Sequence, residues 1–364
     1  MTSGIGCFGL MKPALGSFHG LPTYRELQWS LESNSGYLLT AERPPRLWRI
    51  PAGLEVMRKT HVRAEQAWSC SFTADNVLLG RKEWILVRYD LSNPSDIREL
   101  PWASNPDYAF GASHPPSGTF LLAQRTGAPP FDCKFYSSPG NEPVERWSTK
   151  LGDAPTQVEF DQAGERLLVV YVRAPAVEVL SARSGESLLK IPHKMQNAVF
   201  AGKADNIIGL IASKRSATGA ADELWQLDGR TGKLLRTNAF NFRGNCLVVS
   251  PDHSLIALGG ADRMIHISEA ETLKVKMSIR VHDDEVTALA FHPSRPVIAT
   301  ASMDGSVKLW DYTTKKMVNY FIGLEGTPVC LSFSPNGKLL AVDGQEFTSR
   351  VFDVSKDMPG ARAK

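Results

Sequence analysis

Short apolar runs recur along the chain, and turns rich in Gly, Pro, Ser and Asp separate them. The clearest example is the segment 281–312, in which VTALAF, VIATAS and SVKLW are divided by two turns and followed by Asp311. Val, Ile and Thr favour strands, whereas Pro, Ser and Asp-Gly favour turns, so we predict three antiparallel strands here. A single small sheet has an open edge and little core of its own, so it requires neighbours.

Weaker copies of this unit cover nearly the whole chain. Each copy has an apolar strand that ends at an anchor residue, then a turn, a second strand, another turn and a third strand. The anchors are Leu31, Phe72, Ala112, Phe160, Phe200, Val249, Phe291 and Phe333. Their spacing of about 40–50 residues indicates a β-propeller with four strands per blade. We therefore predict an all-β fold, a closed propeller of eight four-stranded antiparallel blades. The alternative is seven blades, with the first or third unit reduced to a side element.

Four residues of the strongest unit carry a family resemblance. His282, Thr300, Asp304 and Trp310 stand at the spacing of the WD-repeat β-propeller family, which the chain resembles over about residues 14–354. In that family these residue types form a hydrogen-bonded tetrad that braces a blade, so the resemblance implies a structural role. A buried indole N–H and a buried imidazole both need hydrogen-bond partners, which is consistent with a brace. No other unit of this chain carries all four.

The two ends of the repeat pattern predict how the ring closes. After Asp353 only a short segment rich in Pro, Gly and charge remains, so the eighth unit lacks an outer strand. Residues 14–18 (ALGSF) resemble such a strand, and pairing them with the last three strands would remove an open edge. We predict an N-terminal extension over residues 1–13, a single propeller over residues 14–354, and a flexible tail over residues 355–364.

Composition and motifs narrow the function classes. The net charge of +3 is too small to favour nucleic acid as a partner. We expect no membrane span and no signal peptide, because apolar runs are short. The five cysteines show no CxxC spacing, which favours a reducing, cytoplasmic location. The eight histidines are scattered among the units, G-x-S-x-G and P-loop motifs are missing, and no G-x-G-x-x-G motif precedes a helix. We therefore predict no enzymatic activity, no cofactor and no metal.

The resemblance implies a non-catalytic scaffold or adaptor that binds protein partners, as a monomeric propeller or a subunit of a complex. Two alternatives stay open: a propeller hydrolase or lactonase with a channel metal, and a binder of anionic phosphorylated, lipid or nucleic-acid ligands. Residues 241–245 (NFRGN) faintly resemble the Phe-Arg-Arg-Gly motif of phosphoinositide-binding propellers, but they hold a single Arg, which favours an ordinary loop.

In WD-repeat propellers the loops between second and third strands lie on the top face, together with the loops that lead into each blade. In this chain the former loops are basic and carry the candidate partner-binding residues Arg43, Arg46, Arg81, Lys82, Arg125, Arg173, Lys214 and Arg215. One hypothesis is a basic arc that recruits an acidic or phosphorylated segment; the other is scattered surface charge. Tryptophans outside the repeat position are either interface anchors or packed along outer strands: Trp84, Trp102 and Trp147.

Overall fold

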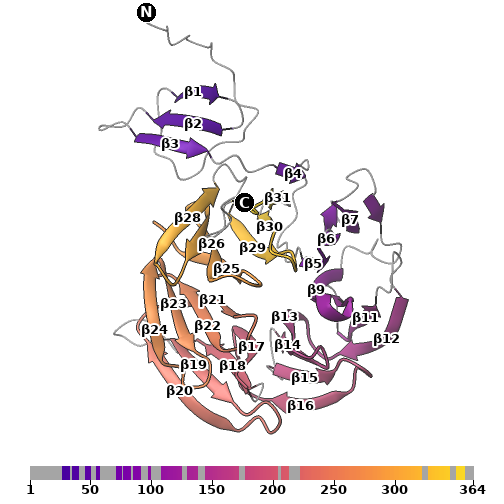
Figure 1. Cartoon of the computed structure of the whole chain (residues 1–364). Helices are drawn as coiled ribbons and strands as arrows, with labels where there is room; N and C mark the ends of the chain where they lie inside the picture. Colours follow the sequence, from indigo (N-terminus) through magenta and orange to yellow (C-terminus); the bar gives the residue numbers. More distant parts are fainter. Residues whose placement is uncertain are drawn as a thin grey trace, which may run out of the picture.

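The structure is a computed structural model of the chain. It describes residues 27–32, 35–40, 46–50, 55–57, 71–75, 77–82, 85–91, 97–99, 108–124, 129–137, 144–171, 177–203, 206–212, 222–321, 327–344 and 350–356. For several strands, most of them in the N-terminal third, only the backbone is described. Within these ranges the fold is all-β, with one short 3-10 helix, η1 (Pro115–Ser117). Figure 1 shows the strands arranged as small sheets around a ring.

Six of the sheets are each built from four antiparallel strands that are consecutive in the chain. The first two contain β5 (Ser71–Ala74), β6 (Val77–Lys82), β7 (Ile85–Asp90), β8 (Ile97–Glu99), and β9 (Tyr108–His114), β10 (Thr119–Gln124), β11 (Phe131–Ser137), β12 (Val144–Leu151). The next two contain β13 (Pro155–Phe160), β14 (Arg166–Tyr171), β15 (Val177–Ser181), β16 (Ser187–Ile191), and β17 (Asn197–Ala201), β18 (Asn206–Ile211), β19 (Asp222–Leu227), β20 (Leu234–Phe240). The last two contain β21 (Gly244–Val249), β22 (Leu255–Gly260), β23 (Met264–Glu269), β24 (Val275–Arg280), and β25 (Val286–Phe291), β26 (Val297–Ser302), β27 (Val307–Asp311), β28 (Lys316–Phe321).

Two further sheets depart from this plan. The C-terminal strands β29 (Pro328–Phe333), β30 (Leu339–Gly344) and β31 (Arg350–Asp353) are completed by β4 (Glu55–Met57) from the other end of the chain. In this pairing Met57 lies opposite Val351, and Glu55 lies opposite Phe352. The first strands, β1 (Leu27–Glu32), β2 (Ser35–Thr40) and β3 (Arg46–Ile50), form a three-stranded sheet that lies outside the ring in Figure 1.

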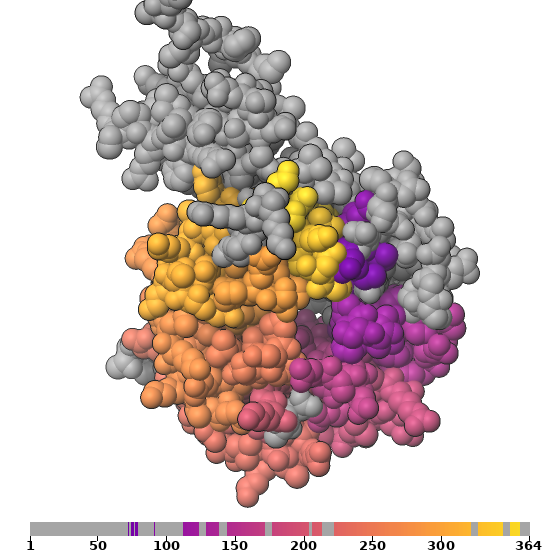
Figure 2. All heavy atoms as spheres, viewed as in Figure 1, coloured from indigo at the N-terminus to yellow at the C-terminus, as the bar shows by residue number. Residues whose placement is uncertain are grey.

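The ring closes between the composite sheet and the β5–β8 sheet. The inner strands β29 and β5 are in contact, as are β5 and β9. Phe72 and Leu78 pack with Ala341 and Val351 in one hydrophobic cluster, and Asn336 N donates to a carboxylate oxygen of Asp75 over 2.8 Å. Figure 2 shows the same neighbourhood, with the yellow C-terminal sheet beside the indigo strands. The β1–β3 sheet takes no part in this closure.

These observations correct the predicted blade count. The ring of eight blades is wrong, because β1–β3 stay outside the ring and β4 occupies the free edge of β31. Seven complete repeat units are not formed either, since among the described strands six sheets consist of four consecutive strands. The predicted closing strand, residues 14–18, lies outside the described residues, and the domain boundaries at residues 13 and 354 stay predictions. The all-β propeller architecture itself is confirmed.

The core lies between neighbouring sheets and not inside any one of them. One cluster, for example, joins Ala288, Val297 and Leu309 of the β25–β28 sheet to Leu340 and Val342 of the composite sheet. Second strands are therefore buried on both faces, and every residue of β26 is buried. Outer strands such as β20 are largely exposed. We call the side that carries the loops leading into inner strands the upper side, and the side with the turns that precede outer strands the lower side.

Candidate interaction surface

A buried polar network connects two upper loops of the β25–β28 sheet. His282, in the loop before β25, is 2% exposed. Its Nδ1 lies 2.9 Å from a carboxylate oxygen of Asp304, and its Nε2 lies 2.8 Å from the hydroxyl of Thr300. Ser306 donates to the other Asp304 oxygen over 2.6 Å, and the Asp283 N–H donates to Asp304 over 3.2 Å. The two loops, residues 281–285 and 302–306, are thus held in one geometry.

The electrostatics of Asp304 support this bracing role. Burial by itself opposes ionisation of this carboxyl group. The hydrogen bond and charge of His282, with the Ser306 hydroxyl and the Asp283 amide, outweigh burial and hold the Asp304 pKa well below its usual range. The ammonium group of Lys308 lies 3.9 Å from Asp304 and donates to the Val281 carbonyl over 3.1 Å. Asp304 is therefore an ionised carboxylate that several neighbouring groups stabilise.

Trp310, the fourth residue of the predicted tetrad, is not linked to the other three. Its indole Nε1 is buried and has no hydrogen-bond partner among the described residues. The ring packs instead against the cluster that contains Ile267 and Ile298. The Thr300 hydroxyl donates to the Lys308 carbonyl over 3.3 Å. The structure thus brings together His282, Thr300 and Asp304, and adds Ser306, which sequence reasoning missed although it lies two residues after Asp304.

Around this network the upper side carries exposed groups of mixed character. Asp283 and Asp284 are exposed, and Met303 is 47% exposed in the loop that Asp304 fixes. Arg243, from the loop before β21, forms an ion pair with Glu285, which also accepts from the Asn245 amide over 3.1 Å. The Arg243 guanidinium therefore links neighbouring sheets. Residues 241–245 resemble a phosphoinositide-binding motif, but the charge of Arg243 is already paired with Glu285.

Eight basic residues are the candidates for partner binding. Five of them lie outside the described residues: Arg43, Arg125, Arg173, Lys214 and Arg215. The other three lie in strands at positions where only the backbone is described: Arg46 in β3, and Arg81 and Lys82 in β6. The basic arc stays a prediction. Trp147 is described: its ring stacks on Phe135 and its Nε1 donates to the Ala182 carbonyl over 2.8 Å, so it packs between neighbouring sheets.

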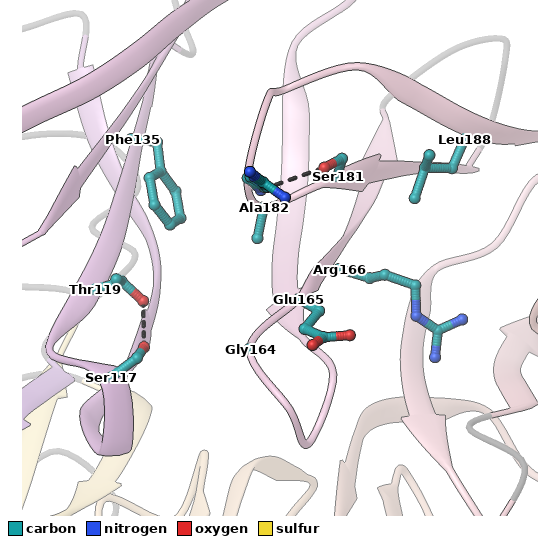
Figure 3. A pocket seen from close by; sticks show the side chains of 10 residues that line it. Ser117, Thr119, Phe135, Gly164, Glu165, Arg166, Ser181, Ala182 and Leu188 are labelled. Carbon is teal, nitrogen blue, oxygen red and sulfur yellow. Dashed lines mark hydrogen bonds between the residues drawn. The ribbon is translucent and has the colours of Figure 1, made fainter.

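A depression of about 550 Å³ lies on the lower side, where the β9–β12 and β13–β16 sheets meet (Figure 3). Its lining includes Ser117, Glu165, Arg166 and Ser181. Arg166 is paired with Asp161 at 2.8 Å, and the Ser181 hydroxyl accepts the amide protons of a turn. The lining contains no His or Cys. Next to the lining, the Nδ1 atom of His114 lies 2.7 Å from the Ser117 hydroxyl, and its Nε2 atom lies 3.3 Å from the Gln162 carbonyl. The mixed polarity of the depression suits contact with another molecule.

Other chemistry is equally sparse in the described part of the chain. No group of three or more His, Cys, Asp or Glu side chains there could hold a metal ion. Burial raises the pKa of Cys133 and of Cys246 to about 12, so neither thiol is a ready nucleophile. No helix of the described residues is long and apolar enough to cross a membrane.

Comparisons with known proteins agree with the architecture. Residues 273–311 match the model of the WD domain, G-beta repeat. The chain is 28% identical over 144 residues to WD repeat-containing protein 36 of Homo sapiens, which covers 36% of this chain and 16% of that protein. It is 36% identical over 77 residues to the U5 small nuclear ribonucleoprotein 40 kDa protein of Mus musculus, covering 21% of this chain and 22% of that protein.

A solved structure extends the likeness to most of the chain. The crystal structure of the WD40 β-propeller domain of Doa1 matches with a TM-score of 0.61 and 13% identity, covering 86% of this chain and 99% of that chain. The sequence relatives are matched over small parts of their own lengths, from 8% to 22%. The repeat match, the WD-repeat relatives and the shared fold together support the resemblance of this chain to the WD-repeat β-propeller family.

Proposed function

We propose that the chain is a protein-interaction scaffold that binds a segment of a partner on its upper side. Its family supports the general role and agrees with the prediction that it is not an enzyme. The observation that carries the choice of side is the His282 network, which fixes two upper loops around the exposed Met303. A surface that is rigid before binding loses less conformational entropy when a partner docks.

The finer part of the proposal concerns the partner's charge. The basic candidates Arg125, Lys214 and Arg215 belong to loops that sequence reasoning assigns to the upper side. An acidic or phosphorylated segment would complement them, and its association would weaken as salt is added. Asp283 and Asp284 make the loop that leads into β25 acidic, so the basic and the acidic groups together would orient the partner segment. A cytoplasmic location belongs to the same proposal and rests on the absence of paired CxxC cysteines in the sequence.

The test is a quantitative affinity capture of partners with the intact chain and two variants. The first variant carries Arg125→Glu, Lys214→Glu and Arg215→Glu; a matched variant on the lower side carries Arg183→Glu, Lys233→Glu and Lys315→Glu. We expect the upper variant to lose specific partners and the lower variant to keep them, with melting temperatures close to that of the unmodified chain. Met303→Asp should weaken the same partners. Equal partner recovery from all variants at low ionic strength would contradict upper-side binding.

A further inference from the structure

Exposed apolar side chains gather at one level of the ring. Among the described residues, six large apolar side chains on outer strands are between 43% and 55% exposed: Val144, Leu188, Leu234, Leu235, Val275 and Met317. Each is the first or second residue of its strand, in β12, β16, β20, β24 and β28 in turn. These five strands form the perimeter in Figure 1. Because every outer strand begins on the lower side, the six side chains lie along the lower rim.

Cations accompany these apolar side chains. Exposed basic residues stand in the turns just before the outer strands, or at the first position of such a strand: Arg183, Arg230, Lys233, Lys274, Lys315 and Lys316. None of them forms an ion pair with another described residue. Nearby acidic side chains have their own partners. Asp228 accepts amide protons from Arg230 and Thr231, and Glu271 accepts one from Lys203. Glu186 accepts from the Ser184 hydroxyl, and Glu269 is paired with Lys276. We call the six apolar and six basic residues the apolar–basic belt.

We propose that the apolar–basic belt docks the propeller onto a membrane surface that contains anionic lipids. Neighbouring sheets of a propeller are related by rotation about its axis, so equivalent residues lie near one plane. A flat surface can therefore contact the belt of several sheets at once. Aliphatic side chains insert at the boundary of headgroups and acyl chains, while adjacent lysines and arginines bind anionic headgroups. An acidic protein segment would instead have to wrap around the convex outside of the ring. The belt also differs from residues 241–245, where Arg243 is already paired with Glu285.

Sedimentation of the full chain with vesicles tests this docking. The vesicles contain phosphatidylcholine alone, or with about 30% phosphatidylserine as the anionic lipid. One variant removes apolar contacts (Leu188→Ser, Leu235→Ser, Met317→Ser), and another removes charge (Arg183→Gln, Lys274→Gln, Lys316→Gln). The matched control changes an exposed apolar residue and an exposed cation on the upper side, Met303→Ser with Lys194→Gln.

We expect the unmodified chain to bind the anionic vesicles, with less binding as salt is added. Each belt variant should lower the partition constant at least about tenfold, and the control should leave it unchanged. Absence of binding to anionic vesicles at low salt, or an equal loss in the control, would overturn the proposal. So would capture on polyglutamate beads without vesicle binding, because the belt would then serve an acidic protein segment. If a triple variant fails to fold, Lys316→Gln and Met317→Ser tested singly give the same comparison.

Discussion

Replacing His282 by Ala should be among the most destabilising single changes in the β25–β28 sheet. The imidazole is buried and lies within hydrogen-bond distance of a carboxylate oxygen of Asp304 and the Thr300 hydroxyl. A hydrogen bond to a charged group contributes about 1.5–3 kcal/mol, and a buried hydroxyl left without one of its partners costs about 1–3 kcal/mol. Asp304 and Thr300 keep other hydrogen bonds, so these contributions do not add fully. We expect a loss of about 2–4 kcal/mol in the free energy of unfolding.

Trp310→Phe is the internal comparison for this prediction. If Trp310 belonged to the tetrad, removing its N–H would cost about 1–3 kcal/mol, as the family pattern suggests. In the structure the Nε1 atom has no partner among the described residues, so Phe removes an unsatisfied donor and leaves a small cavity. We expect a loss of less than about 1.5 kcal/mol. Urea unfolding followed by circular dichroism measures both values. A cost for His282→Ala equal to or below that for Trp310→Phe would refute the reasoning.

Three further predictions concern ionisation and ring closure. The pKa of Asp304 is lower in the folded protein than the unfolded value of 3.8. The ionised Asp304 carboxylate therefore stabilises the fold above pH 3.8, and this contribution disappears as the pH falls through the folded-state pKa. Asp304→Asn should flatten the acid limb of a curve of unfolding free energy against pH. Burial raises the pKa of Glu159 from 4.5 to about 7, so the stability that its neutral form supports is lost as pH rises through about 7. Because Glu159 is half-buried, Glu159→Gln should stabilise the protein by only about 1–2 kcal/mol at pH 8, with no gain at pH 4. Deleting residues 1–50 keeps β4 and should lower the melting temperature by much less than deleting residues 1–57, which exposes the edge of β31; equal melting temperatures would show that β4 does not close the last sheet.

Strand positions could be predicted closely where local pattern determines them. The runs VTALAF and VIATAS coincide with β25 and β26, because alternation, β-branched residues and turn residues all act over a few neighbouring positions. Seven of the eight anchors lie at or near the ends of the inner strands of the ring. The eighth, Leu31, belongs to β1, a strand of the same local character that stays outside the ring.

Which sheet a strand joins depends on edges that are far apart in the chain. The sequence predicts closure through residues 14–18 because the last unit has no outer strand of its own. The structure confirms that β29–β31 are followed by no fourth strand among the described residues. The local pattern could not predict which strand fills this edge. β4 follows β3 in the chain, so it could equally serve as the fourth strand of the β1–β3 sheet. Pairing with β31 leaves the small β1–β3 sheet incomplete while it completes the larger ring. The gain from closing a ring that buries a core on both sides of every sheet favours this choice.

The same distinction applies to the surfaces. His282, Thr300 and Asp304 could be identified as a set because the repeat spacing brings them together, whereas the ion pair of Arg243 with Glu285 joins different sheets and has no signature in either segment. The basic part of the apolar–basic belt could be predicted from the sequence. Lys233, Lys274 and Lys316 each stand at the first position of an outer strand or just before it. From the sequence alone, the apolar residue beside each lysine would be predicted to be buried. Only the position of its strand at the outer edge of a sheet shows that it is exposed. Leu188 and Met317 are exposed because no further strand follows β16 or β28 within their sheets, which is a property of the ring and not of the residues themselves.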